Sequence, residues 1–216
     1  MEIYQLVQKI CGGYHPGVDE VEKLLCAEGQ DLDYIFKAAD EINRFYNGNT
    51  VHIRGIIEFS NYCRASCAYC GLNAGNKELK RYRMEPDEII EVAKKAYDAG
   101  YKTIVLQSGE DLWYSKEKIS YIIREIKAIG GLAITLSVGE RAYEDYRQWK
   151  EDGADRFLLK HETINPRLYK SLHPHSTLAN RILCLKRLKT LGYQTGSGFM
   201  IGLPGQTTRD IAKDIL

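Results

Sequence analysis

The sequence predicts an α/β fold, and within that class a (β/α) TIM-type barrel. After Val51, short β-rich runs alternate with amphipathic helical runs five times, and a polar or glycine-rich segment follows each β-rich run. Successive β-then-α units imply parallel strands joined by right-handed crossovers. The polar segments should therefore share one rim, where the carboxyl ends of the strands meet, and only a curved sheet lets all of them converge.

The N-terminal segment predicts helices instead of strands. Apolar residues recur at helical spacing in "VDEVEKLLCAEG" and again in "DLDYIFKAADEINRFYNG". Cys26, in the first of these runs, is expected to be a small buried apolar side chain. We therefore expect an N-terminal helical segment over residues 1–49 and a barrel domain over residues 50–216.

The remaining elements follow in regular order. Strands are expected at residues 51–59, 103–107, 133–137, 155–160 and 194–201, and helices at 86–99, 116–129, 141–152, 177–191 and from 207 onward. Pro86 suits the first turn of its helix, and Gly100 and Gly130 follow helical runs where a left-handed cap is wanted. The last helical run reaches Leu216 without a stop signal, so we expect a barrel truncated after about five to six β/α units.

Composition excludes several classes of function. Thirty Lys and Arg stand against twenty-nine Asp and Glu, which leaves no overall basic surface for nucleic acid or an anionic membrane. No apolar run is long enough to span a bilayer, and the start "MEIYQLVQKI" does not read as a signal peptide. Six cysteines, three of them clustered, do not form a dense disulfide framework. We expect a cytoplasmic protein with a small-molecule or protein partner.

The stretch "NYCRASCAYCGLN" gathers Cys63, Cys67 and Cys70 directly after the strand-like run "VHIRGIIEFS". A structural zinc site wants four ligands, and only one C-x-x-C pair is present. His173 and His175 lie far along the chain and are expected in a solvated loop. A disulfide would leave one thiol over. Three thiolates suit an iron-sulfur cubane that keeps one iron open to a substrate, which is the favoured interpretation.

Cys63, Cys67, Tyr69 and Cys70 match the pattern C-x-x-x-C-x-aromatic-C, and this stretch resembles the radical S-adenosylmethionine (radical SAM) enzymes. The resemblance implies a [4Fe-4S] cluster on the three cysteines, with S-adenosylmethionine chelated at the open iron. It also implies a one-electron reductant, reductive cleavage of the sulfur-carbon bond, and a 5'-deoxyadenosyl radical that attacks a second substrate.

The segments "KRYRM", "QSGED" and "LPGQT" resemble the HydE family of [FeFe]-hydrogenase maturases, from about Glu58 to the end. That resemblance implies assembly of the hydrogenase H-cluster from an organometallic substrate, with other hydrogenase maturases as partners. Biotin synthase and methylornithine synthase share the architecture and remain alternatives. An alternative from another class is an iron-sulfur or zinc-binding module without catalysis.

The same resemblance assigns contacts to S-adenosylmethionine. Ser108 and Gly109 would meet the methionyl amino end, in place of the family's GGE turn. Glu162 would meet the ribose or the sulfonium region. Arg181 would pair with the carboxylate, or would otherwise be a solvated surface charge on its helix.

The remaining assignments concern adenine and the second substrate. Tyr69 would lend its backbone to the adenine, while Met200 and Ile201 would pack on the adenine face. Thr135 points from the third expected strand toward the cavity and is a candidate for substrate binding, with barrel filling as the alternative. Lys160, where related maturases tend to have arginine, is a second candidate. The basic run "NKELKRYR" is expected to be a solvated loop that screens the cluster, with Arg83 reaching inward as the alternative.

Overall fold

The computed structural model describes all residues from 1 to 216 and divides into two compact units. The strand unit comprises residues 53–162 and 169–199, and the helical unit comprises residues 1–52, 163–168 and 200–216. Each unit is described by itself. The expected domain division at residues 49 and 50 stays a prediction.

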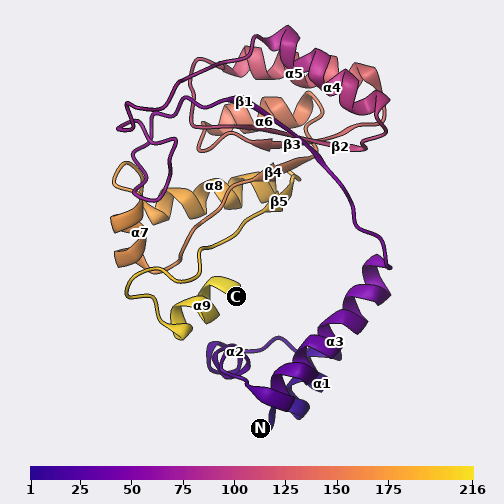
Figure 1. The fold of residues 1–216 in the computed structure, drawn as a ribbon, viewed down its shortest axis with the longest axis vertical. Helices are drawn as coiled ribbons and strands as arrows, with labels where there is room; N and C mark the ends of the chain where they lie inside the picture. Colours follow the sequence, from indigo (N-terminus) through magenta and orange to yellow (C-terminus); the bar gives the residue numbers. More distant parts are fainter. The chain divides into compact units, whose positions relative to one another are not determined.

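The strand unit contains a parallel five-stranded sheet in which each strand neighbours the next along the chain (Figure 1). The strands are β1 Gly55–Ser60, β2 Thr103–Ser108, β3 Ala133–Ser137, β4 Arg156–Leu158 and β5 Gln194–Gly196. A doubly wound sheet reverses its strand order at a switch point, whereas this order never reverses, as in a barrel wall. The predicted α/β fold with parallel strands is confirmed.

Helices connect the strands, and four of them begin at or within two residues of the expected positions. These four are α4 Pro86–Asp98, α5 Lys116–Ile129, α6 Tyr143–Glu151 and α8 Leu178–Thr190, and a fifth helix is α7 Pro166–Leu172. At the start of α5, Ser115 Oγ accepts the Lys118 N–H at 3.3 Å, and at its end Gly130 adopts a φ of 98°. These caps satisfy backbone groups that a helix end leaves without a partner.

Strand lengths and one helix differ from the prediction. The first strand begins at Gly55 and not at residue 51, and β5 ends at Gly196 and not at residue 201. Beyond β5 only an isolated bridge joins Phe199 to Glu162, so the ladder is not continued there. The short helix α7 was not expected, since its seven residues give too brief a periodic pattern.

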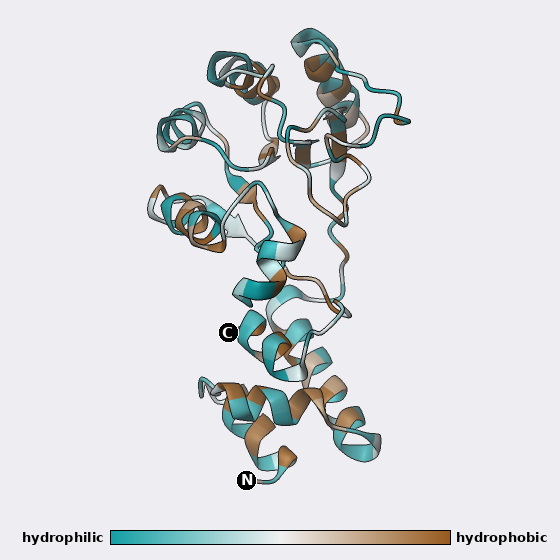
Figure 2. Cartoon of the chain, turned by 90° about the vertical axis from the view of Figure 1, so that its left-hand side faces the viewer, coloured by the Kyte–Doolittle hydropathy of each residue, from teal (hydrophilic) through white to brown (hydrophobic).

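The core of the strand unit lies between the sheet and its helices. Strand residues such as Ile134, Leu136 and Phe157 are fully buried, as are Ile123 of α5 and Trp149 of α6. Trp149 satisfies its one polar group by donating Nε1–H to the Lys116 carbonyl at 3.0 Å. Figure 2 shows the brown apolar stripes that the helices carry opposite their teal faces. Burial of these stripes fixes the helices on the sheet.

The helical unit contains α1 Ile3–Cys11, α2 Val18–Leu25, α3 Gly29–Asn47 and α9 Thr208–Ile215. Ile3, Val7 and Ala38 form its small apolar cluster. The expectation that Cys26 is buried is wrong: the thiol is exposed, because α2 ends at Leu25 and Cys26 is the cap residue beyond the apolar face.

None of the helices combines the length and the apolar character that crossing a membrane requires.

The Leu136→Ala substitution should lower the free energy of unfolding by about 2–5 kcal/mol, because it removes buried methyl groups and leaves a cavity. Leu183→Ala is the control, since Leu183 is 43% exposed, and it should change stability by no more than about 0.5 kcal/mol. Urea denaturation followed by circular dichroism measures both. Equal effects of the two substitutions would contradict this description of the core.

Candidate functional site

A cavity of about 500 Å³ opens at the carboxyl ends of the strands. Its wall includes Glu58 and Ser60 of β1, Gln107 and Ser108 of β2, and Ser137 of β3. It also includes the segment 158–162 at and after β4, with Lys160 and Glu162, and all three clustered cysteines. Chemistry in parallel α/β folds is expected on this rim of the sheet.

The loop that carries the cysteines is held by backbone contacts. The Ala68 N–H donates to the Leu172 carbonyl at 3.0 Å, and the Ala74 N–H donates to the Ala65 carbonyl at 2.8 Å. Arg81 donates to four carbonyl groups around the loop, those of Asn61, Leu72, Asn73 and Asn76. The expectation of a solvated basic loop is therefore wrong for Arg81, whose guanidinium is enclosed by the loop that it braces.

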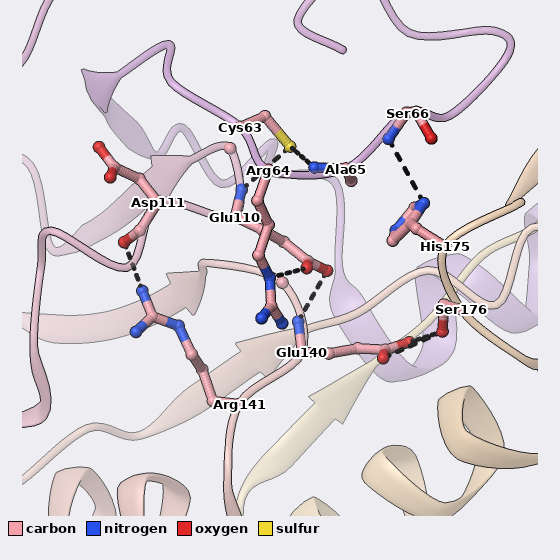
Figure 3. Close-up of polar contacts among 12 residues, drawn as sticks. Cys63, Arg64, Ala65, Ser66, Glu110, Asp111, Glu140, Arg141, His175 and Ser176 are labelled. Atoms are coloured by element: carbon pink, nitrogen blue, oxygen red, sulfur yellow. Dashed lines mark hydrogen bonds and ion pairs between the residues drawn. The ribbon is translucent and has the colours of Figure 1, made fainter. Parts of the chain in front are cut away.

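The sulfur of Cys63 accepts two backbone N–H groups, from Ala65 at 3.4 Å and from Glu110 at 3.3 Å (Figure 3). Gly109 permits the second contact. A Cβ atom at Gly109 would lie 2.3 Å from the Tyr62 carbonyl oxygen and 2.7 Å from the Cys63 Cβ, so no larger residue fits without a shift. The loop after β2 thus approaches the cysteine loop backbone to backbone.

The three thiols perturb one another. Burial raises the pKa of Cys67 to about 11, and the neighbouring Cys63 and Cys70 add to the rise. Thiolates crowded in this way are costly unless a cation or a cationic cluster shares their charge. Since three half-buried thiols line one cavity, the donor set fits an iron-sulfur cluster held by Cys63, Cys67 and Cys70.

His173 is buried at 2% exposure, so its expected place in a solvated loop is wrong. Helix α7 carries it inward, and its ring stacks on Tyr169 with centroids 4.6 Å apart. Burial lowers the pKa of His173 to about 4, with Arg181 and His175 adding to the effect. His175, in contrast, is exposed and accepts the Ser66 N–H at 3.4 Å (Figure 3).

Cys67 and Tyr69 both contact His173, and Tyr69 also contacts Glu162. The Cys67 Sγ atom lies 3.4 Å from His173 Nδ1, and the Tyr69 hydroxyl lies 3.2 Å from His173 Nε2 and 3.1 Å from Glu162 Oε1. Glu162 adopts a φ of 66°, which is unusual for a residue with a side chain and costs backbone strain. The carboxylate of this residue is buried and lines the cavity.

The two histidines also give a mononuclear metal site some geometric support. Ligand atoms of Cys67, His173 and His175 lie within 4.8 Å of one another. Spacing along the sequence could not reveal this group, because 106 residues separate Cys67 from His173. A structural zinc site requires four protein ligands, and this group supplies only three.

Arg181 is 6% exposed and lines the cavity, so the alternative of a solvated surface charge is wrong. Its Nε atom lies 2.8 Å from Glu140 Oε1 and 3.2 Å from the Tyr169 hydroxyl. Glu140 also accepts from Ser176 at 2.9 Å and from Asn180 at 2.6 Å (Figure 3 shows Glu140 and Ser176). These partners hold the guanidinium in place on α8.

Glu110 joins the loops after β2 and β3. Its carboxylate pairs with Arg64 Nε at 3.2 Å and accepts the Glu140 N–H at 3.0 Å (Figure 3). A Cβ atom at Gly139 would lie 2.1 Å from the Glu110 Cγ, and Gly139 adopts a φ of 74°. Only glycine therefore allows Glu110 to reach across, and no sequence signal other than its place after a strand marks this buried carboxylate.

A second buried carboxylate, Asp111, binds the cysteine loop to β1. Arg83 donates to it through Nε at 2.7 Å and Nη2 at 2.9 Å, and the Ser60 hydroxyl donates at 2.7 Å. The Asp111 backbone carbonyl accepts from Arg141 at 2.8 Å (Figure 3). These contacts fasten the strand ends beneath the cavity.

Only some of the other predicted site residues line the cavity. Ser108 and Lys160 line the cavity. Thr135 is buried within β3 and is not among the residues that line the cavity. This position agrees with the alternative that Thr135 fills the barrel interior. Met200 and Ile201 belong to the helical unit, and their contact with adenine stays a prediction.

Comparison with known proteins gives a consistent result. A sequence profile described as "Radical SAM superfamily" matches residues 57–216. The [FeFe] hydrogenase maturase subunit HydE of Thermotoga maritima is 58% identical over 182 residues, which cover 84% of this chain and 52% of that protein. The 3-methylornithine synthase of Methanosarcina acetivorans is 31% identical over 199 residues, which cover 91% of this chain and 57% of that protein. The chain spans about half the length of these curated relatives.

Solved structures agree on the fold. The crystal structure of methylornithine synthase (PylB) superimposes with a TM-score of 0.88 at 28% identity, covering 97% of this chain and 63% of that one. The structure of HydG, a maturase of the [FeFe]-hydrogenase, gives a TM-score of 0.87 at 23% identity over 97% of this chain and 48% of that one. The second likeness shows the fold alone. The predicted barrel-type α/β architecture is confirmed.

Glu140→Ala should lower the free energy of unfolding by about 3–5 kcal/mol, because it leaves the Arg181 guanidinium buried without its anionic partner. Asp40→Ala is the matched control, since it breaks an exposed ion pair with Arg44 and should cost no more than about 1 kcal/mol. Urea denaturation compares the two. Similar losses of unfolding free energy would mean that the buried ion pair stabilises the protein no more than the exposed one.

Proposed function

The chain belongs to the radical SAM superfamily, and we propose that it acts as a radical SAM enzyme in [FeFe]-hydrogenase maturation. The observation that carries the proposal is the cavity itself. Three half-buried thiols line it together with a buried arginine, two buried carboxylates and the close backbone approach at Gly109. This set of groups suits one cluster and one zwitterionic cofactor.

Cys63, Cys67 and Cys70 would hold a [4Fe-4S] cluster, and S-adenosylmethionine would bind beside it. When bound and reduced, the cluster would supply one electron for the reductive cleavage of S-adenosylmethionine. The residues of the chain bind and orient the cofactor and keep water out. Strand ends and loops surround the cavity on several sides, which restricts the approach of solvent to a reactive species.

Each polar group of the cavity would match one end of the cofactor. Arg181, fixed by Glu140, would pair with the carboxylate, and Ser108 and Gly109 would meet the amino end. Glu162 would accept hydrogen bonds from the ribose hydroxyl groups. Tyr69 would offer its backbone to the adenine.

The second substrate and the partners are inferred from similarity. The 58% identity to HydE supports an organometallic substrate, a one-electron reductant, other hydrogenase maturases as partners and a cytoplasmic location. Lys160 lines the cavity and would face the substrate, whereas the place of Thr135 within the sheet favours packing. The match to PylB supports a second candidate, an amino-acid rearrangement of the methylornithine synthase type.

The protein, reconstituted anaerobically with iron and sulfide and then treated with dithionite and S-adenosylmethionine, should form 5'-deoxyadenosine, which chromatography detects. Cys63→Ser, Cys67→Ser and Cys70→Ser should each abolish the product, because a cubane on two thiolates is not stably held. Cys11→Ser, at an exposed cysteine of the helical unit, should leave it unchanged. A protein that binds zinc through Cys67 and the two histidines, and yields no 5'-deoxyadenosine once loaded with iron, would refute the proposal in favour of a non-catalytic module.

A further inference from the structure

His173 lies at the centre of a hydrogen-bonded chain that leads from a cluster cysteine to a carboxylate. The contacts run from Cys67 Sγ to His173 Nδ1 at 3.4 Å and from His173 Nε2 to the Tyr69 hydroxyl at 3.2 Å. They continue from that hydroxyl to Glu162 Oε1 at 3.1 Å. The imidazole is 2% exposed and stacked on Tyr169, so its orientation is fixed.

The direction of the bonds follows from what each group can donate. A thiolate that binds iron carries no proton and can only accept a hydrogen bond. A neutral imidazole beside it must hold its proton on Nδ1, which leaves Nε2 as an acceptor. The Tyr69 hydroxyl is within reach of Nε2 and is the group that can donate to it.

This arrangement changes the partner of Glu162. The Tyr69 hydroxyl has one proton, and both His173 Nε2 and the Glu162 carboxylate would accept it. A proton donated to His173 is withdrawn from Glu162, whose side chain lines the cavity. Glu162 is then available to a donor group of a ligand, so occupation of the cysteines and preparation of the carboxylate are coupled through Tyr69.

We propose that His173 is a positioning residue for the cluster, which donates Nδ1–H to the Cys67 thiolate while the Tyr69 hydroxyl fixes that tautomer. The inference rests on the proposed function, because it requires a cluster on Cys67. A hydrogen bond to a cluster sulfur stabilises the added electron and raises the reduction potential. His173 therefore makes the cluster easier to reduce.

The test is a redox titration of the anaerobically reconstituted full chain, followed by electron paramagnetic resonance. In His173→Leu the reduced-to-oxidised ratio at a fixed potential should fall about tenfold, which is 59 mV for a one-electron couple. His173→Asn, whose amide nitrogen occupies the place of Nδ1, should keep the wild-type potential. Tyr69→Phe should lower the potential by less than His173→Leu.

His175→Leu is the matched control. His175 is an exposed imidazole near the same loop, and its Nδ1 accepts the Ser66 N–H, so that nitrogen carries no proton to donate to a cysteine sulfur. Its substitution should leave the potential unchanged. Should His173→Leu fail to fold, the potentials of His173→Asn and Tyr69→Phe still decide the matter.

Three results would overturn the inference alone: a wild-type potential in loaded His173→Leu, equal potentials in His173→Asn and His173→Leu, or strong nitrogen hyperfine coupling that makes His173 a ligand of iron. If His173→Leu does not fold, a wild-type potential in loaded Tyr69→Phe overturns it. A wild-type chain that takes up no iron and sulfide overturns the proposed function, and this inference with it.

Discussion

Confinement of three thiols in one half-buried cavity is the constraint on which the site depends. Thiolates that share such a space repel one another, and burial opposes their charge, as the raised pKa of Cys67 shows. Several hydrogen-bond donors lie around the thiols. Two backbone N–H groups point at Cys63, and the Arg181 guanidinium lies on the same cavity wall. Positive charge and N–H donors thus lie on the wall of the cavity that holds the thiols.

Those donors keep their positions because three buried carboxylates connect the strand ends. Glu140 holds Arg181, Glu110 joins the loops after β2 and β3, and Asp111 fastens Arg83 beneath the cysteine loop. Each of these contacts would be a weak source of stability on its own, since desolvation offsets much of the attraction. Their main contribution is to fix the positions of the groups that they join. Removal of one partner leaves a buried charge, so the network permits few arrangements other than the observed one.

The sequence predicted the parts of the site that local patterns encode. Alternating β-rich and helical runs gave parallel strands and their rim, and the spacing of three cysteines gave the candidate cluster loop. It failed where distant residues decide the environment. Arg81 is enclosed by carbonyl groups and His173 is buried by α7, although local composition favoured solvated loops for both. The prediction for Cys26 failed in the opposite sense, because a side chain one residue beyond the helix end no longer lies on the apolar face.

Two glycines show why such contacts escape periodicity. Gly109 and Gly139 leave room for a cysteine and for Glu110, and a Cβ atom at either position would lie under 3 Å from its neighbour. In the sequence each is an ordinary glycine after a strand, compatible with any turn. In the fold, the first glycine lets a backbone N–H reach Cys63 and the second lets a carboxylate cross between loops. The close approach of three loops is therefore a property of the parallel sheet that brings their strand ends together, and the glycines are the residues that make that approach possible.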